Sequence, residues 1–145
     1  MSSLIKKLGE DLDLYLTKWA PCWIVDFPMF ETSKEGNLTP LHHPFTLPKC
    51  SAKELEDNPK DSIAHAYDVV LNGYEIGGGS LRIYDNAMQK IIFNILNISK
   101  EDAESKFGFL LKALSSGCPP HGGIAFGLDR IAVSYTHLTL PTSPK

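Results

Sequence analysis

The sequence predicts an α+β fold in which an antiparallel sheet is flanked by helices. Two observations lead to this prediction. Asn72-Gly73 lies between two short apolar segments, and this dipeptide is the strongest short-range signal for a β-hairpin. Farther along, apolar residues recur at helical spacing in two segments, each preceded by a good N-cap residue, Asp85 or Ser99. A hairpin-based sheet followed by separate helices is typical of the α+β class.

The composition fits one domain in a reducing, cytoplasmic setting. Of 145 residues, 43% are hydrophobic, which is enough for a core. The 14 Lys+Arg against 17 Asp+Glu give a net charge of -3, so the chain lacks the basic excess of a self-sufficient nucleic-acid binder. No apolar run is long enough to span a membrane, and no signal peptide is recognisable. Cys22, Cys50 and Cys118 lack the spacing of a zinc or redox motif.

The first elements are expected to be a helix and a buried strand. Leucine and isoleucine recur at helical spacing until Ala20-Pro21 interrupts the pattern, at Leu4, Ile5, Leu8 and Leu12. Residues 22–27 then form a short apolar and aromatic run that ends at Pro28, which is typical of a buried strand.

A long loop follows, broken by one glycine and three prolines, Gly36, Pro40, Pro44 and Pro48. We place His42 and His43 on this loop, because loops often carry binding residues. Ser51 and Glu54 have the capping-box spacing and predict a brief helix after it.

The second half is expected to alternate strands and helices. Residues 66–71 and the segment from Tyr74 form the hairpin strands. The helix after Asp85 has an apolar stripe of Met88, Ile91, Ile92, Ile95 and Leu96, and the helix after Ser99 has one of Phe107, Leu110, Leu111 and Leu114. Gly117 and two prolines end the latter. Residues 122–127 resemble a strand, and Asp129 could open a helix. Residues 134–145 lack helical periodicity, so we expect that helix to make little use of them.

The hairpin brings two acids to one face of the sheet. A two-residue turn pairs Val70 with Glu75, and Asp68 shares the face of Val70, so Asp68 and Glu75 lie on the same side. Magnesium uses one or two carboxylates together with substrate phosphates, and this pair supplies that number. The alternative is two solvated acids on an exposed face.

Three consecutive glycines follow Glu75 and suggest a close approach to the backbone there. Glycine inside a strand costs stability and often marks a bulge or a ligand contact. In an uninterrupted strand Arg82 would face away from Glu75. If both serve one site, residues 77–79 must contain a bulge, and we predict it. The alternative for Arg82 alone is a surface arginine.

Other candidate residues are the tandem His42-His43 and Arg130. Adjacent histidines project differently and have no further ligand at zinc spacing, so we do not predict zinc. His43 could equally be a packing residue. Arg130 lies at the start of an expected helix, where backbone N–H groups and the helix dipole favour phosphate. The alternative is an arginine paired with Asp129 or solvent.

Taken together, three segments resemble the bacterial-type aspartyl-tRNA synthetases, which are class II aminoacyl-tRNA synthetases. They read HHPFT, GYEIGGGSLR and GGIAFGLDR, and begin at His42, Gly73 and Gly122. The resemblance runs from about residue 19 to 133 and implies the C-terminal part of the class II catalytic domain. Residues 1–18 would end an insertion domain or its connection, and residues 134–145 would be a foreign, disordered tail.

The resemblance also implies ligands and roles. His42 and His43 would contact the substrate L-aspartate, and Arg82 would hold its side-chain carboxylate by a bidentate fork. Asp68 and Glu75 would bind the Mg²⁺ on ATP. Glu75 and a run of four residues would bind ATP itself, namely Gly127, Leu128, Asp129 and Arg130. No dedicated catalytic nucleophile is implied, because positioning and charge neutralisation supply most of such catalysis.

The same resemblance implies that the chain is incomplete. Motif one, which builds the homodimer interface, motif two and the anticodon-binding domain that contacts tRNA are not found in it. We therefore expect the isolated chain to be inactive. Two other functions stay open: a non-catalytic remnant or paralogue that binds a small molecule, and a tRNA-independent ligase of the same fold, such as an asparagine synthetase.

Overall fold

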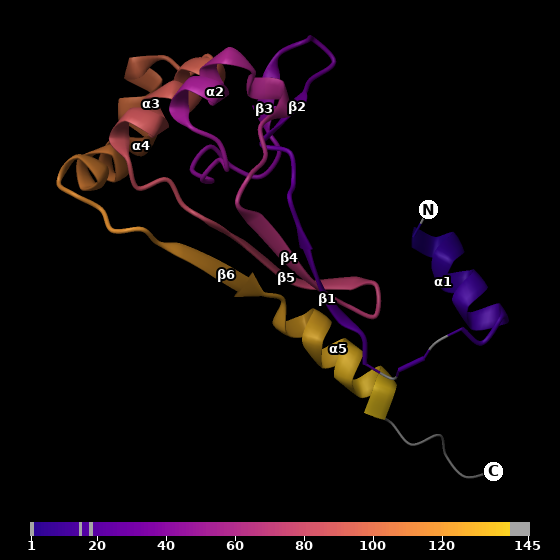
Figure 1. Cartoon of the computed structure of the whole chain (residues 1–145). Coiled ribbons are helices and arrows are strands. Elements are labelled where there is room, and N and C mark those ends of the chain that lie inside the picture. The colour runs from indigo at the N-terminus through magenta and orange to yellow at the C-terminus, as the bar shows by residue number, and fades with distance from the viewer. Residues whose placement is uncertain (1, 15, 18, 140–145) are drawn as a thin grey trace. The chain divides into compact units, whose positions relative to one another are not determined.

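The computed structural model describes residues 2–14, 16–17 and 19–139 and has the predicted α+β fold with an antiparallel sheet and helices (Figure 1). The elements are α1 (Ser2–Asp11), β1 (Pro21–Val25), β2 (Phe30–Thr32), β3 (Leu38–Pro40), α2 (Ala52–Asp57), a 3₁₀ turn η1 (Pro59–Asp61), β4 (Ala66–Leu71), β5 (Tyr74–Leu81), α3 (Asn86–Ile95), α4 (Lys100–Ser115), β6 (Gly122–Phe126) and α5 (Leu128–Thr139). None of the helices in these ranges is long and apolar enough to cross a membrane.

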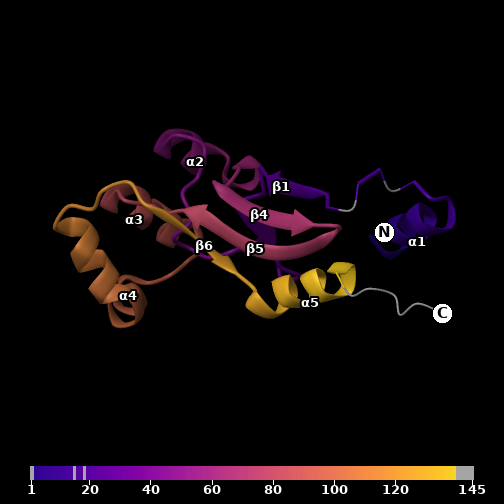
Figure 2. The same ribbon diagram turned by 90° about the horizontal axis from the view of Figure 1, so that it is seen from below.

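The chain forms two compact units. The first contains the described residues of Met1–Ile24, Asp68–Gly78 and Ile124–Lys145, and the second contains Val25–Tyr67 and Gly79–Gly123. The main sheet has the strand order β1-β4-β5-β6, visible from below in Figure 2. β2 and β3 form a separate antiparallel pair within the loop region, with Glu31 opposite Thr39. The sequence did not predict this small pair, because each of its strands has only three residues.

The hairpin of β4 and β5 is confirmed. Asn72 and Gly73 both have positive φ, 51° and 78°, as a type I′ turn requires, and Leu71 and Tyr74 flank the turn. A regular ladder continuing from that pair would place Leu81 opposite residue 64. Instead, the Leu81 N–H donates to the carbonyl of His65 at 2.9 Å. β5 therefore carries one extra residue between Tyr74 and Leu81, which agrees with the predicted bulge.

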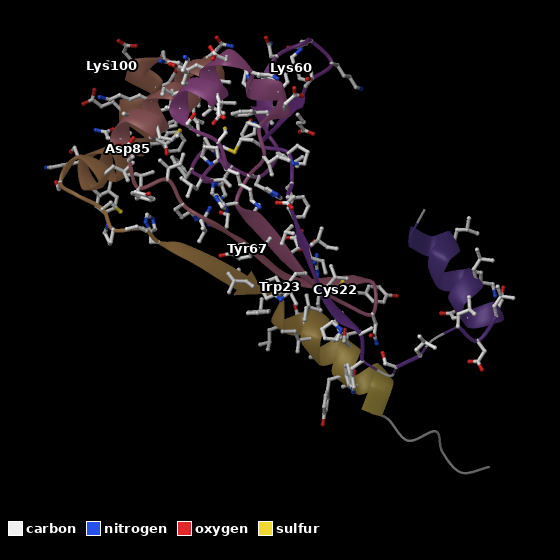
Figure 3. All side chains as sticks on the ribbon, in the orientation of Figure 1. Cys22, Trp23, Lys60, Tyr67, Asp85 and Lys100 are labelled. Carbon is white, nitrogen blue, oxygen red and sulfur yellow. The ribbon has the colours of Figure 1, made fainter. Side chains whose placement is uncertain are left out.

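The expectation of a buried first strand is wrong. β1 begins at Pro21 and ends at Val25, and all five of its residues are exposed, including Trp23, labelled in Figure 3, at 60%. β6 is likewise exposed along its length. A strand needs only a hydrogen-bonded neighbour, whereas burial needs a second layer over its face. The apolar run therefore signals the strand but not its burial.

The capped helices of the second unit are confirmed. Ser51 and Glu54 form a complete capping box at the start of α2. The side chain of Asp85, labelled in Figure 3, accepts from the Met88 N–H at 2.9 Å at the start of α3. Ser99 accepts from the Asp102 N–H at 3.0 Å at the start of α4. These caps satisfy backbone N–H groups that a helix leaves without partners.

The ends of the chain differ from expectation. α1 confirms the first helix but ends at Asp11, and Leu4 and Leu8 are exposed. α5 runs to Thr139, so the expectation that a helix from Asp129 would make little use of residues 134–139 is wrong. Serine and threonine are tolerated on an exposed helix face, here with the Thr136 hydroxyl donating to the Val133 carbonyl at 3.0 Å. The foreign origin of residues 134–145 stays a prediction, and residues 140–145 lie outside the described ones.

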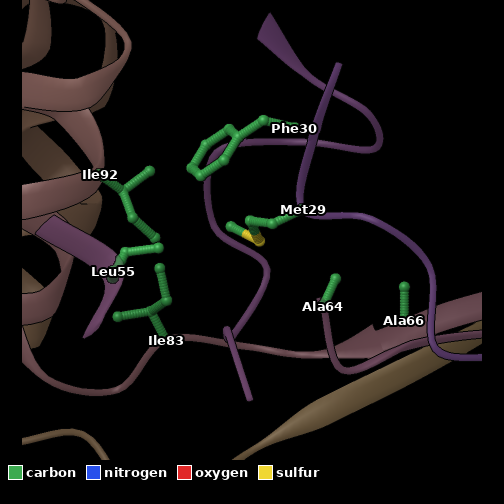
Figure 4. Packing of buried hydrophobic residues seen from close by; sticks show 7 residues of the cluster. All are labelled: Met29, Phe30, Leu55, Ala64, Ala66, Ile83 and Ile92. Atoms are coloured by element: carbon green, nitrogen blue, oxygen red, sulfur yellow. The ribbon is translucent and has the colours of Figure 1, made fainter. Parts of the chain in front are cut away.

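The apolar core lies in the second unit. Seven residues from the loops, β2, α2, β4, the segment after β5 and α3 pack together there, as Figure 4 shows: Met29, Phe30, Leu55, Ala64, Ala66, Ile83 and Ile92. Leu55 of α2 and Ile92 of α3 are completely buried. This core holds α3 against the segments that flank the loop with His42 and His43, called the histidine loop below.

Candidate functional site

The histidine loop is fixed along the end of β5. Thr46 forms an antiparallel bridge with Arg82. On either side of it, the Ile83 N–H donates to the Phe45 carbonyl and the Leu47 N–H donates to the Leu81 carbonyl, both at 2.9 Å. Arg82 therefore lies beside the loop that carries His43, although the two residues are 39 positions apart in the sequence.

An aromatic cluster anchors the same loop to the helices. The Phe45 ring makes edge-to-face contacts with Phe107 of α4, at 4.9 Å between ring centroids, and with Phe93 of α3, at 6.2 Å. Phe93 and Phe107 stack on each other at 5.7 Å. Such aromatic contacts add to area burial and favour one ring geometry. The HHPFT segment is thus held by its backbone on one side and by its phenylalanine on the other.

Three polar groups lie close to one ring nitrogen of His43, Nδ1. Its Nδ1 lies 3.1 Å from Nη1 of Arg82 and 3.2 Å from the backbone nitrogen of Phe45, and the Thr46 hydroxyl is 3.4 Å away. Arginine stays protonated and a backbone N–H can only donate, so Nδ1 must be the acceptor. His43 is therefore neutral with its proton on Nε2, and Nε2–H remains as a donor.

Burial and charge agree with that protonation state. Desolvation, followed by the Arg82 guanidinium and the His42 imidazole, lowers the pKa of His43 from 6.5 to about 4. A protonated ring would point an N–H at two other N–H donors. His43 is thus an uncharged donor at physiological pH.

His42 points to a different neighbour. Its ring meets Phe27 edge to face with centroids 4.9 Å apart, and its side chain is exposed. The structure thus joins His43 to Arg82, whereas His42 packs against the segment that follows β1.

Because His43 and Arg82 offer only N–H donors once Nδ1 of His43 is used, they suit a ligand oxygen that accepts hydrogen bonds, such as a carboxylate.

A second cluster, in the first unit, joins Glu75 to Arg130. Arg130 Nη1 donates to the backbone carbonyl of Glu75 at 3.0 Å and lies 3.4 Å from its carboxylate Oε1. Both side chains are more than half exposed, at 61% and 52%. Gly127 permits this arrangement, because a Cβ there would come within 3.3 Å of the Arg130 side chain. The alternative pairing of Arg130 with Asp129 is not the one that forms.

A hollow of about 750 Å³ lies beside this pair. It is lined by the hairpin turn and α5 through Asn72, Tyr74, Glu75, Asp129, Arg130, Val133 and Ser134. Leu128, which the resemblance also assigned to ATP, is 78% exposed. A hollow of this size holds a small molecule, and it contains three of the residues that the sequence assigned to ATP, namely Glu75, Asp129 and Arg130.

The predicted magnesium pair, Asp68 and Glu75, lies on the two strands of the hairpin. Asp68 ends up half-buried on β4, and Glu75 is exposed near the start of β5. Among the described residues no group of three or more potential ligands gathers to hold a metal unaided. Mg²⁺ bound with a nucleotide needs fewer, because phosphates and waters fill its remaining positions. Magnesium at Asp68 and Glu75 stays a prediction, and Arg130 would have to share Glu75 with the ion.

The glycine run has a structural role that the sequence did not predict. A Cβ at Gly77 would lie 2.6 Å from the Phe126 ring and 2.8 Å from the Ala125 carbonyl oxygen. β6 thus occupies the space at Gly77 that we assigned to a ligand. Gly77 is needed for strand packing.

Sequence reasoning missed Gln89. It is fully buried on α3, and its Nε2 donates to the Pro44 carbonyl at 2.8 Å. A signal was present, since Gln89 lies three residues before Ile92 and so on a buried face of the helix. A polar residue on such a face requires a partner.

Comparisons with known proteins place the fold. A profile of the family "tRNA synthetases class II (D, K and N)" matches residues 6–139. The solved aspartyl-tRNA synthetase of Entamoeba histolytica is similar, with a TM-score of 0.62 and 22% identity over 95% of this chain and 24% of its own. The asparaginyl-tRNA synthetase of Pyrococcus horikoshii has a TM-score of 0.59 and 19% identity over 97% of this chain and 27% of its own.

A third similar structure is the Entamoeba histolytica asparaginyl-tRNA synthetase in complex with asparaginyl-adenylate, with a TM-score of 0.57 and 15% identity over 89% of this chain and 23% of its own. The chain thus spans about a quarter of the length of these solved structures. At these identities the similarity to them shows the fold. The family profile covers most of the chain, and the chain belongs to the class II tRNA synthetase family of the D, K and N type.

Proposed function

We propose that the chain is part of an aspartate-tRNA ligase, and that His43, Arg82 and His42 bind L-aspartate. The observation that favours aspartate over the related amino acids is the donor-only character of His43 and Arg82. A side-chain carboxylate accepts from both, whereas the amide nitrogen of asparagine would find no acceptor there and the lysine ammonium would meet Arg82. Arginine also gives a planar fork that matches a carboxylate.

In this proposal the second cluster binds ATP. Asp68 and Glu75 hold the Mg²⁺ that neutralises the phosphates, and Arg130 meets adenine or phosphate beside Gly127, Leu128 and Asp129. Arg130 lies close to the N-terminal end of α5. Backbone N–H groups and the helix dipole favour a negatively charged group such as phosphate there. Its contact with the Glu75 carboxylate is exposed and weak, so it can be exchanged for nucleotide contacts.

The reaction proposed has two steps. The carboxylate of aspartate attacks the α-phosphorus of ATP, which releases pyrophosphate and leaves aspartyl-adenylate. The aspartyl group then passes to the terminal adenosine of tRNA, and AMP leaves. Further parts of the parent protein would bind tRNA and form a homodimer, and a cytoplasmic location is proposed with them.

ATP–pyrophosphate exchange tests this proposal. We expect no exchange by the 145-residue chain alone, and exchange that depends on aspartate once the upstream part of the catalytic domain is supplied. Exchange by the chain alone would contradict the proposal that the chain lacks a part of the catalytic domain needed for activity. Exchange that depends on asparagine or lysine would contradict aspartate as the substrate.

Two outcomes would favour the alternatives. Aspartate binding without exchange in the longer protein points to a sensor or non-catalytic paralogue. Asparagine formation from aspartate, ATP and ammonia without tRNA points to a ligase of the asparagine synthetase kind.

A further inference from the structure

We infer that Gln89 is a positioning residue, which sets the orientation and tautomer of His43 through the Pro44–Phe45 peptide group. The inference rests on the proposed function only for the identity of the ligand. Among the described residues no hydrogen bond joins Gln89 to His43 or Arg82, so Gln89 would act through the backbone of the loop.

One peptide plane links Gln89 to His43. The carbonyl of Pro44 and the N–H of Phe45 belong to the same peptide group, whose C=O and N–H point in opposite directions in one rigid plane. The carbonyl accepts from Gln89 Nε2 at 2.8 Å, and the N–H donates to His43 Nδ1 at 3.2 Å. Rotating this plane would break both bonds together. Gln89 therefore fixes one of the two N–H donors that keep Nδ1 unprotonated.

Arg82 donates to the same nitrogen, since its Nη1 lies 3.1 Å from His43 Nδ1. The bond from Gln89 to the Pro44 carbonyl polarises the peptide group and strengthens the donation from the Phe45 N–H to Nδ1. Nε2–H of His43 has no hydrogen-bond partner among the described residues, so it can donate to a ligand oxygen.

The position of Gln89 argues against a role in stability alone. Its side chain is fully buried, and its Oε1 has no hydrogen-bond partner among the described residues. The Pro44 carbonyl can only accept, so the nitrogen must face it and the oxygen cannot be turned toward it. An apolar residue of similar size would avoid burying an unpaired oxygen. What such a residue could not do is hold the Pro44 carbonyl.

Gln89 is the one glutamine in the sequence, so the wild-type chain allows a direct test. Labelling with ¹⁵N-glutamine gives a single side-chain NH₂ pair in the NMR spectrum. We expect one of its protons to exchange slowly with solvent and His43 to show the Nε2–H tautomer. Rapid exchange of both protons, or an Nδ1–H tautomer of His43, would overturn the inference without any substitution.

A pair of variants separates positioning from folding. Gln89→Met removes the donor with little change in volume, and Lys90→Met places the same residue at the next, exposed position of α3. In Q89M we expect the Nδ1–H tautomer of His43 to appear beside the Nε2–H tautomer, because the Phe45 N–H is no longer held against Nδ1. K90M should leave the tautomer of His43 unchanged. A folded Q89M with an unchanged His43 would contradict the inference.

Ligand binding is tested in a separate experiment. Calorimetry with L-aspartate should show about tenfold weaker binding to Q89M than to K90M. Equal affinities would remove the link from Gln89 to ligand binding. If neither protein nor the wild type binds aspartate, the proposed function fails, whereas the NMR result on His43 still decides the role of Gln89.

Discussion

The protonation of His43 ties the stability of the protein to pH. Burial and the Arg82 charge lower its pKa from 6.5 to about 4, so the folded state binds fewer protons than the unfolded state between those values. This contribution to stability is complete above the ordinary pKa and is lost as pH falls toward 4. We expect the thermal midpoint to fall over that range, and to fall less in His43→Asn.

The comparison of the two proteins isolates His43. The pKa of His65 is also lowered, by burial and by Lys49, so it contributes in the same direction to both proteins and cancels in the difference. Asparagine keeps an acceptor near the position of Nδ1 but does not titrate. Parallel pH profiles for the two proteins would show that His43 is not the group responsible.

Glu75 should matter for nucleotide binding more than for stability. Its ion pair with Arg130 is exposed on both sides, and such pairs stabilise proteins by about 0–1 kcal/mol. We expect Glu75→Gln to change the thermal midpoint little and to weaken the Mg²⁺-dependent binding of ATP about tenfold. Fluorescence titration with an ATP analogue measures this.

A matched control for Glu75 is the exposed pair of Lys7 with Asp11 on α1. Lys7→Gln breaks an ion pair of the same kind outside the hollow and should leave ATP binding unchanged. If both variants bind the nucleotide as the wild type does, Glu75 is a solvated acid and has no role in the metal site.

At the scale of elements, the contact of β5 with β6 depends on Gly77. A Cβ at this position would lie 2.6 Å from the Phe126 ring and 2.8 Å from the Ala125 carbonyl, so one strand must shift. We expect Gly77→Ala to destabilise the protein by about 1–3 kcal/mol in denaturant unfolding. Gly123→Ala on β6 meets nothing within 4 Å and should stay within about 0.5 kcal/mol of the wild type. Equal effects of the two would contradict the packing role of Gly77.

The elements that the sequence predicted well have local signals. Asn72-Gly73 encodes its turn through positive φ at both residues, and Asp85 and Ser99 bond to N–H groups three residues away. Nothing local encodes burial, so the apolar run of β1 predicts a strand but not its exposure. α5 continues past Ser134 because weak helix formers are tolerated within an exposed helix once it has begun.

The candidate site likewise has features that the sequence predicted and features that it did not. Motif resemblance singles out His43, Arg82, Glu75 and Arg130 as candidates, but it cannot tell which of their atoms make contact. That His43 accepts at Nδ1, and that Gln89 supports the loop from 45 residues away, follow from long-range packing of α3 on the loop. The pairing of Arg130 with Glu75 is likewise set by the contact of α5 with the hairpin.

At the scale of the whole molecule, the second unit has its own apolar core. Leu55 and Ile92 are fully buried between α2 and α3, while Phe109 on α4 is 91% exposed. Leu55→Ala should therefore cost about 2–5 kcal/mol in the unfolding of this unit, and Phe109→Ala within about 0.5 kcal/mol. Calorimetric unfolding measures both. A small effect at Leu55 would mean that the helices are not held by this core.

Membership in the D, K and N family does not decide which amino acid binds, and we propose that His43 and Arg82 form a donor-only pair for the aspartate side chain. The most direct measurement is calorimetric binding of L-aspartate and L-asparagine to the wild type, to Arg82→Gln and to the exposed-charge control Lys53→Gln. We expect aspartate to bind at least about tenfold more tightly than asparagine, and this preference to vanish in R82Q but not in K53Q. Binding of asparagine as tight as that of aspartate, or an unchanged preference in R82Q, would contradict the claim.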